Sequence, residues 1–187
     1  MLPHILSDSL SLDLLAPRHA AALFAAVEAN RAHLREWLPW VDETRSVDDT
    51  RRFIDRMRDQ YRATEGFQAT ILTDGEVVGL AGHHRIDWRN RSTSLGYWLA
   101  RDRQGKGIMT RTCTAIVDHA FRTLDLHRVE IRCAAGNRRS RALAERLGFR
   151  SEGERRGAEL LNGAFVDHVI YACLAPEWRA ETVDRRS

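Results

Sequence analysis

Residues 95–110 read LGYWLARDRQGKGIMT: an apolar run with strand character, a loop that holds two glycines, and the start of a helix. Gly105 and Gly107 flank Lys106, which is the only lysine of the chain. Glycines let the backbone approach a ligand closely, and the free N–H groups and positive dipole of a helix N-terminus attract anions. The segment therefore predicts either an anion-binding junction of strand, loop and helix, or a structural turn that begins a helix.

The spacing of the glycines excludes two common phosphate-binding motifs. A nucleoside-triphosphate loop has the pattern GxxxxGK[ST], whereas here the lysine lies between the glycines and the earlier glycine of the pattern is missing. A dinucleotide-binding loop, GxGxxG, needs its third glycine at the position that Thr110 occupies. A different anionic ligand, or none, therefore has to be considered for this loop.

Hydrophobic periodicity and turn residues extend the fold on both sides of this segment. Alternating or apolar runs predict strands over Leu10–Leu14, Gln68–Thr73, Val77–His84, Ser92–Leu99, Arg128–Ala134, Phe149–Arg156 and Phe165–Cys173. Helical spacing, with Pro17 and Asp48 as start signals and Gly148 as a stop signal, predicts helices over Pro17–Asn30, Asp48–Glu65, Gly107–Leu124 and Asn137–Arg146. This order of elements predicts a mixed α/β sheet with helices on its faces.

The composition is that of one soluble globular domain. Of its 187 residues 43% are hydrophobic and 29% charged, and no apolar run reaches the ~18 residues of a membrane helix. The N-terminus lacks the regions of a signal peptide, and Cys113, Cys133 and Cys173 have no metal-ligand spacing. These features predict a reduced cytoplasmic protein without metal, and the net charge of +3 favours an anionic ligand or partner.

A second segment, GNRRSRALAERLGF at residues 136–149, narrows the interpretation of the loop. Together the two segments resemble the GNAT superfamily of N-acetyltransferases, with its loop pattern Q/R-x-x-G-x-G/A and its later pattern N-x-x-S…LGF. Gln104 and Gly107 match the loop pattern, and Asn137 and Ser140 match the later one. Met109 stands where the loop pattern has glycine or alanine. Two motifs in the expected strand and helix context are far more specific than either motif alone.

Further segments are similar to the RimJ/RimL-like branch, which acetylates ribosomal-protein N-termini. They are LREWLPWVD at 34–42, GHHRIDW at 82–88 and the continuous stretch 136–172. The resemblance implies a single N-acetyltransferase domain over 1–187, with a core at about 10–174 and a tail at 175–187. It implies a twisted, mostly antiparallel mixed sheet of about seven strands with helices on both faces, acetyl-CoA as cosubstrate without a metal, and a homodimer. Direct binding to nucleic acid or membrane is not expected.

The resemblance also implies the site residues. The backbone of the loop would bind the pyrophosphate of coenzyme A, and the preceding strand and the second helix start would bind pantetheine or the ribose phosphate. The cofactor-binding residues expected in this way are Trp98, Leu99, Ala100, Arg103, Gln104, Gly105, Lys106, Gly107, Ile108, Met109, Asn137 and Arg141. Glu159 is expected to act as the base through a water molecule, and Ser140 as the acid toward the leaving thiolate.

The pKa of the reacting amine bears on which molecule accepts the acetyl group. An α-amine has a pKa of about 7.7–8.0 and a lysine side chain one near 10.4, so a protein N-terminus is roughly a few hundred times more available as a free amine at neutral pH. A single carboxylate acting through water is then sufficient as base. Other assignments stay open: Glu159 as a surface glutamate, Ser140 as a helix cap, and His83 or His84 as the base. The alternatives for function are a small-amine acetyltransferase, acting on a polyamine or aminoglycoside, and a non-catalytic acyl-CoA sensor.

Overall fold

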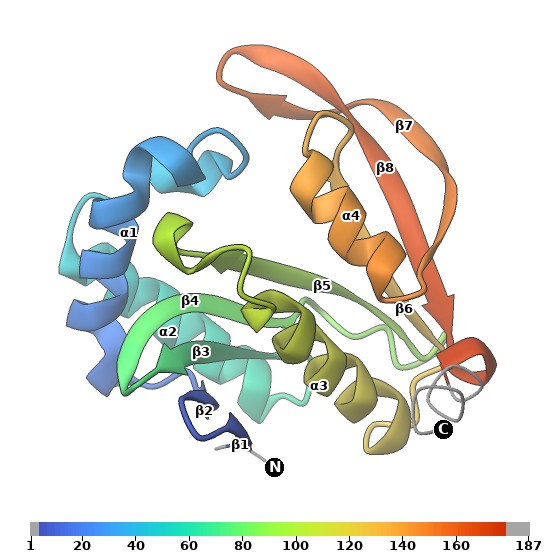
Figure 1. Ribbon diagram of the computed structural model, residues 1–187, viewed down its shortest axis with the longest axis horizontal. Helices are drawn as coiled ribbons and strands as arrows, with labels where there is room; N and C mark the ends of the chain where they lie inside the picture. The colour runs from blue at the N-terminus through green and yellow to red at the C-terminus, as the bar shows by residue number, and fades with distance from the viewer. Residues whose placement is uncertain (1–3, 179–187) are drawn as a thin grey trace.

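The computed structural model describes residues 4–178, which form one open sheet of eight strands (Figure 1). The strands are β1 (His4–Ser7), β2 (Leu10–Leu14), β3 (Phe67–Thr73), β4 (Glu76–His83), β5 (Ser92–Leu99), β6 (Arg128–Ala134), β7 (Arg150–Leu161) and β8 (Ala164–Leu174). Their order in the sheet is β1-β2-β3-β4-β5-β6-β8-β7. All neighbouring pairs are antiparallel except β5 and β6, which are parallel.

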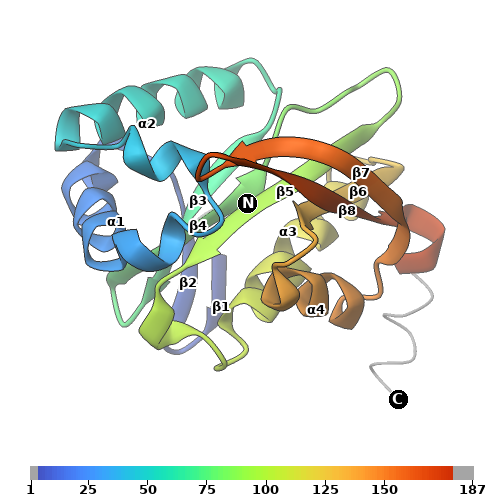
Figure 2. The ribbon, with the colours of Figure 1, turned by 90° about the horizontal axis from the view of Figure 1, so that it is seen from above.

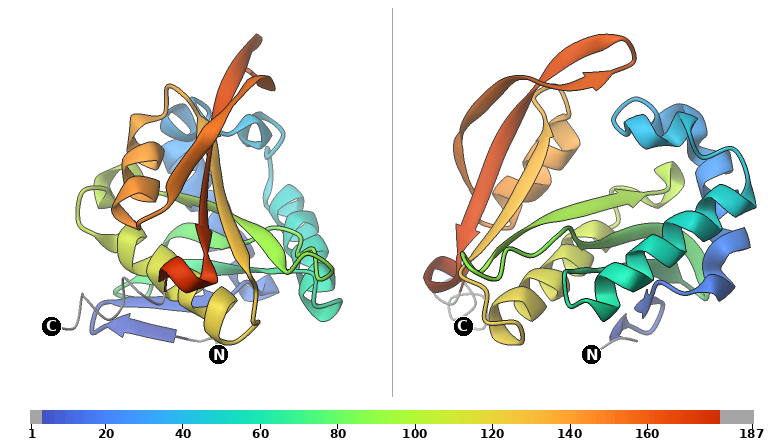
Figure 3. Two further views of the ribbon diagram at one scale, coloured as in Figure 1. Left: turned by 90° about the vertical axis from the view of Figure 1, so that its right-hand side faces the viewer. Right: turned by 180° about the vertical axis from the view of Figure 1, so that it is seen from behind.

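Helices cover both faces of the sheet, as the views in Figures 1 and 3 show. The α-helices are α1 (Ala20–Leu34), α2 (Val47–Arg62), α3 (Ile108–Arg122) and α4 (Arg138–Arg146), and short 3-10 helices are η1 (Pro17–His19), η2 (Pro39–Asp42) and η3 (Arg101–Arg103). One apolar cluster joins α1 and α2 to one face of the sheet, and a second joins α3 and α4 to the other. None of the helices in the described part of the chain is long and apolar enough to cross a membrane.

The alternation of side chains along β5 explains how this strand serves both clusters. Leu95 and Leu99 are buried in the cluster beneath α3, whereas Trp98 is buried with Leu80 in the cluster beneath α1 and α2. Because both faces of β5 are covered, its position in the molecule is held from both sides. This strand leads directly into η3 and the glycine loop.

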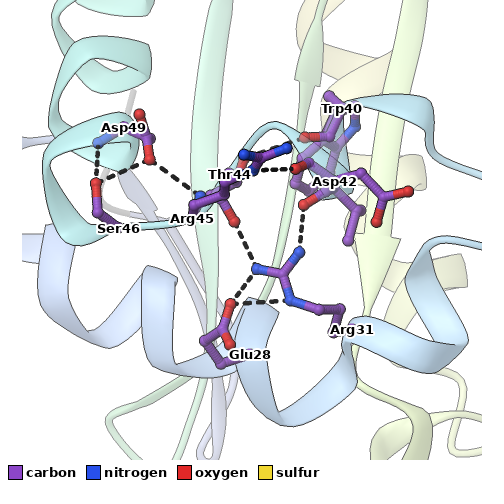
Figure 4. Close-up of polar contacts among 9 residues, drawn as sticks. Glu28, Arg31, Trp40, Asp42, Thr44, Arg45, Ser46 and Asp49 are labelled. Atoms are coloured by element: carbon purple, nitrogen blue, oxygen red, sulfur yellow. Dashed lines mark hydrogen bonds and ion pairs between the residues drawn. The ribbon is translucent and has the colours of Figure 1, made fainter.

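Polar contacts hold the connection between α1 and α2 (Figure 4). Arg31 on α1 donates to the carbonyl groups of Val41 and Thr44 and pairs with Glu28. The hydroxyl of Ser46 accepts from the N–H of Asp49 at 3.2 Å and caps the N-terminus of α2. These contacts give a defined shape to a segment that has little regular structure.

The sheet splits between its two parallel strands. β5 and β6 pair from Ser92 with Arg128 to Leu95 with Ile131, and both strands then continue without pairing to each other. Figure 1 shows the resulting V, with β5 in one arm and β6, β8 and β7 in the other. Beyond the split, the facing edges of both strands have backbone groups that no strand satisfies.

The predicted mixed sheet with helices on both faces is confirmed, with two corrections to its elements. The sheet has eight strands instead of about seven, because the short edge strand β1 was not expected. The predicted strand Phe149–Arg156 extends through Leu161, so Glu159 lies within β7 and not in a connection between strands. Neither segment has the alternation of buried and exposed residues by which strands are recognised: β1 and the first ten residues of β7 have no fully buried residue.

The chain after β8 also contributes to the core. Trp178 falls in the segment 175–187 assigned to a tail, yet its side chain is buried against Phe121 of α3, with ring centroids 6.3 Å apart. Its indole N–H donates to the carboxylate of Asp118 at 2.9 Å. The remainder of that segment, 179–187, lies outside the described residues.

Candidate active site

A large cleft occupies the split between β5 and β6, with a volume of about 1800 Å³. Its walls come from α1, η2 and α2 on one side and from α4, β7 and β8 on the other, while the glycine loop and the start of α3 lie at one end. The view from above shows the β7–β8 hairpin arching over this region (Figure 2). The cleft lining therefore has two regions, one beside the loop and α4, the other beside α2 and the hairpin.

The loop end of the cleft presents free backbone N–H groups. Gly107 is the N-cap of α3 with φ +73°, a left-handed conformation, and no side chain caps the helix. The first hydrogen bond of α3 runs from the N–H of Arg111 to the carbonyl of Gly107 at 3.1 Å, so the N–H groups of residues 108–110 have no partner within the helix. No atom lies within 4 Å of where a Cβ at Gly105 or Gly107 would be. This open, amide-lined junction suits a phosphate group.

Gln104 links the loop to three other elements. Its side-chain nitrogen is 2.8 Å from Nε2 of His33 on α1 and 3.4 Å from the carbonyl of Leu99, and its side-chain oxygen accepts from Arg139 on α4. Burial lowers the pKa of His33, so the ring is neutral and can accept. Arg103 pairs with Glu76 at 3.0 Å. The side chain of Gln104 thus holds the loop in place from both arms of the V.

The expected cofactor-binding residues fall into two groups. Those that line the cleft are Trp98, Leu99, Arg103, Gln104, Gly105, Gly107, Ile108, Met109 and Asn137. The cleft lining does not include Ala100, Lys106 or Arg141. Arg141 lies on another face of α4, where its guanidinium donates to the hydroxyl of Tyr171 at 3.1 Å and to the carbonyl of Ala135 at 3.2 Å. Arg139, two residues earlier, and Arg146, at the end of the helix, are the α4 arginines that line the cleft.

Ser140 lies on the α4 wall, with its hydroxyl oxygen 2.7 Å from the phenol oxygen of Tyr97 on β5. Asn137 caps α4, since its side-chain oxygen accepts from the N–H of Ser140 at 3.1 Å. The capping role considered for Ser140 is therefore filled by Asn137. Burial strongly raises the pKa of Tyr97, so its phenol stays protonated and can donate to Ser140. The pair leaves the proton of the Ser140 hydroxyl available to a third group.

Glu159 lies on the hairpin wall, where its carboxylate accepts from Nε2 of His168 on β8 at 3.1 Å. The two side chains are partly buried, at 30% and 18% exposure. An irregularity in the β7–β8 ladder between Arg155 and Glu159 adds two residues to β7. Because such a bulge changes where a strand's side chains point, it contributes to placing Glu159 beside His168.

His83 is the last residue of β4 and His84 follows it, and the two side chains point to opposite sides, as strand geometry requires. His83 is fully buried between Phe67 and α3, and its Nε2 donates to the carbonyl of Ile116 at 3.2 Å; burial lowers its pKa to about 3. His84 lines the cleft, with Nδ1 3.0 Å from the hydroxyl of Ser94. Desolvation and Arg132 lower its pKa. Of the two histidines considered as bases, the structure brings His84 alone to the cleft.

The cleft residues that the sequence did not single out include three with reactive or titratable groups beside the predicted site: Tyr97, Cys133 and His168. Tyr97 stands two residues from Leu95 and Leu99 in β5, so strand alternation alone suggests a core position for it. Cys133 is a buried thiol near Ser140, and burial raises its pKa. No local pattern marks His168, whose partner is nine residues away on another strand. In residues 4–178 no group of three or more histidine, cysteine, aspartate or glutamate residues could hold a metal ion.

Comparison with known proteins agrees with this architecture. A family model for an acetyltransferase (GNAT) domain matches residues 9–150. The putative ribosomal N-acetyltransferase YdaF of Bacillus subtilis is 37% identical over 176 residues, which are 94% of this chain and 96% of the relative. The ribosomal-protein-serine acetyltransferase of Escherichia coli is 31% identical over 166 residues, 89% of this chain and 93% of the relative.

A solved structure of the RimL ribosomal L7/L12 α-N-protein acetyltransferase, in complex with coenzyme A, superposes with a TM-score of 0.88 at 30% identity. The similarity covers 91% of this chain and 96% of that one. The family match, the identity of the relatives and the split parallel strands beside an amide-lined loop all agree. This chain belongs to the GNAT acetyltransferase family and is an N-acetyltransferase that uses acetyl-CoA.

Proposed function

We propose that the enzyme acetylates the N-terminal α-amine of a protein, by direct transfer from acetyl-CoA. One observation carries the proposal: a carboxylate–histidine pair, Glu159 with His168, and a phenol–hydroxyl pair, Tyr97 with Ser140, face the same cleft from different walls. The first can take a proton from the amine and the second can give one to the leaving thiolate. Relatives named as ribosomal-protein acetyltransferases support a protein N-terminus as the acceptor. A ribosomal protein as acceptor would agree with the cytoplasmic location expected from the sequence.

Acetyl-CoA supplies a thioester, whose acetyl group forms a bond to the amine nitrogen as its C–S bond breaks. The N–H groups that follow Gly107 would hold the pyrophosphate, with Arg139 adding charge, and the free edge of β5 from Gly96 to Leu99 would pair with pantetheine. Glu159 accepts the proton of the amine through water, and His168 orients the carboxylate. Ser140 gives its proton to the thiolate, while Tyr97 stabilises the serine oxygen by donating to it.

A screen of candidate amines, with products identified by mass spectrometry, tests which class of amine accepts the acetyl group. Peptides with a free N-terminus and an internal lysine are compared with the same peptides blocked at the N-terminus, and with free diamines and aminoglycosides. We expect acetylation of the α-amine alone, because its lower pKa leaves far more of it unprotonated at neutral pH. Turnover of a diamine or aminoglycoside without turnover of any peptide would contradict the proposal.

Replacing Glu159 with Gln tests the base. The amide cannot accept a proton, so kcat should fall about 10²–10⁴-fold at pH 7, the range that general acid–base catalysis contributes. The KM for acetyl-CoA should change little, because Glu159 lies on the hairpin wall and not at the loop. Glu154→Gln is the matched control, since Glu154 lies on the same strand outside the cleft lining. An unchanged kcat with an unchanged pH profile would remove Glu159 from the mechanism.

A further inference from the structure

The region of the cleft beside α2 and the β7–β8 hairpin, which is the acceptor end in the proposed function, is rich in arginine. This region lies on the side of the molecule away from the glycine loop. In Figure 1 the helices α3 and α4 face the viewer, and in the view from behind in Figure 3 the helix α2 is in front. The arginines that line this end come from α2, β7 and β6 and from the residue after His84. They are Arg52, Arg56, Arg85, Arg132 and Arg155.

Three of these arginines are already neutralised by carboxylates of the protein. Arg52 pairs with Asp49, Arg85 with Glu65 at 3.0 Å, and Arg132 with Glu130 at 2.6 Å. Arg56 and Arg155 differ, because neither has an ion pair or a side-chain hydrogen bond with any of residues 4–178. Two positive charges, one on each wall, therefore face the space where the acceptor enters.

The acidic residues of the same region do not cancel these two charges. Asp49 is engaged with Ser46, with the N–H of Arg45 and with Arg52, at the start of α2. Glu159 is engaged with His168. Glu43, on the η2 side, is the remaining carboxylate of the cleft lining in the described residues. A cationic acceptor would meet Arg56 and Arg155 unfavourably, whereas an anionic one would supply the partners that they lack.

We propose that the acceptor is an N-terminal segment with carboxylate side chains shortly after its first residue, and that Arg56 and Arg155 bind these carboxylates. The inference rests on the proposed function, because it describes the chain behind the reacting amine. Arg155 lies four residues before Glu159 on β7, so an acceptor whose amine reaches Glu159 passes beside Arg155. Arg56 holds the same segment from the α2 side. The arrangement selects acidic N-termini and disfavours polyamines.

Three peptides of equal length and identical first residue test the selection. Residues two to five of the peptides carry two Asp, two Asn or two Lys at the same positions, separated by Ala. We expect kcat/KM to fall in the order Asp, Asn, Lys, with about a tenfold difference between Asp and Asn, as charge-assisted hydrogen bonds to arginine provide. The difference should shrink in 0.5 M NaCl, since partly exposed charges are screened by salt.

Two variants test the residues, Arg56→Gln and Arg155→Gln. Each should lower the ratio of kcat/KM for the Asp peptide to that for the Asn peptide, and the double variant should bring the ratio close to one. The ratio is measured within one protein preparation, so a fraction of misfolded enzyme does not affect it. Arg156→Gln is the matched control, because Arg156 is the next residue of β7 and does not line the cleft; its ratio should equal that of the unmodified enzyme.

The outcomes separate this inference from the proposed function. If all three peptides react at equal rates, the acidic selection is wrong and acetylation of protein N-termini stands. If the Asp peptide is preferred but the double variant keeps the preference, Arg56 and Arg155 are not its source and the inference fails. If no peptide reacts while acetyl-CoA binds normally, the proposed function itself is overturned.

Discussion

Among single residues, Tyr97 and Ser140 form the contact with the most direct bearing on the chemistry. They come from β5 and α4, and their oxygens are 2.7 Å apart across the split in the sheet. Burial holds the pKa of Tyr97 well above its usual range, so the phenol remains a donor at all physiological pH values. In the proposed mechanism Ser140 is the group whose proton moves to the thiolate, and Tyr97 is a positioning residue.

Single and double variants test this division of roles. Ser140→Ala should lower kcat about 10²-fold, and Tyr97→Phe less, about tenfold, because the serine keeps its proton but loses its orientation. Since both residues act through one proton transfer, the double variant should be no slower than Ser140→Ala. Steady-state kcat at saturating acetyl-CoA and acceptor is the measurement. Effects that multiply in the double variant would show that the two residues act independently.

His83 is a second residue with a measurable consequence, in this case for stability. Its pKa is about 3 in the folded protein because the ring is buried, against about 6.5 in an unfolded chain. Between these values the unfolded chain binds the proton and the folded protein does not, so falling pH favours unfolding. The contribution of neutral His83 to the free energy of unfolding is fully present above about pH 6.5, and it is lost progressively as the pH falls toward 3.

The free energy of unfolding should therefore fall by on the order of 1 kcal/mol per pH unit between pH 6.5 and 4 on account of His83 alone. Denaturant titrations of the unmodified protein and of His83→Gln, at four pH values, measure this contribution as the difference in slope. The variant is expected to be less stable at pH 7, where it disturbs the packing between Phe67 and α3, but to lose less stability as the pH falls. Equal slopes would mean that the proton reaches His83 without unfolding.

Among the elements, the start of α3 has the most specialised conformation. Gly105 and Gly107 both have positive φ, at +75° and +73°, and together they turn the chain from η3 into the helix. The left-handed conformation costs other residues about 1 kcal/mol or more, and it leaves the first amides of α3 open to the cleft. The glycines are required by the backbone, and the charge of Lys106 lies outside the cleft lining.

Gly107→Ala tests this element against Gly75→Ala, a glycine with φ +80° in the β3–β4 turn. Both variants should lose roughly 1 kcal/mol of stability, because both strain the backbone and neither Cβ meets another atom within 4 Å. Only Gly107→Ala should raise the KM for acetyl-CoA, because its methyl group occupies the junction proposed for the pyrophosphate. Acetyl-pantetheine, which lacks the pyrophosphate, should show no such change; an equal rise for both thioesters would place the pyrophosphate elsewhere.

For the whole molecule, the tip of the β7–β8 hairpin forms a contact between the two arms of the V. The hairpin turns at Asn162 and Gly163, which have positive φ as an Asn-Gly turn requires. The side chain of Asn162 donates to the carbonyl of Arg35, at the end of α1, at 3.0 Å. Figure 2 shows the tip of the hairpin beside the segment between α1 and α2. One exposed hydrogen bond thus joins the wall that holds Glu159 to the opposite wall.

Asn162→Gly should keep the turn and remove the bond, because glycine adopts positive φ without strain. The hairpin then samples more open positions, and kcat/KM for the peptide acceptor should fall by a few-fold, corresponding to the roughly 0.5–1.5 kcal/mol of one hydrogen bond. The KM for acetyl-CoA, which is proposed to bind at the other end, is the internal control. A loss confined to acetyl-CoA would argue that the hairpin acts on the cofactor end.

Local sequence signals account for most of the elements. The helix starts, the β3–β4 hairpin and the strand–loop–helix junction at residues 95–110 were predictable, because each depends on neighbouring residues: a glycine, a cap or an alternation of apolar side chains. Glu159 was expected in a connection, and eleven of the twelve residues of β7 are not buried, so the segment has no alternation typical of a strand. The backbone pairing with β8 makes this segment a strand, and no periodicity reports that pairing.

The sequence by itself determined the family, the mixed sheet and the acetyl-CoA dependence, because two motifs with fixed spacing encode the loop and the second helix. Only the tertiary structure decided which side chains meet in the cleft: Tyr97 with Ser140 across 43 positions, and Glu159 with His168 through a bulge. It also brings Arg56 and Arg155, which have no ion pair with any of residues 4–178, to opposite walls. The physical reason is that these contacts depend on where β5 and β6 separate and on how β7 bends. Both are set by strand pairing over long distances in the chain, which no local pattern contains.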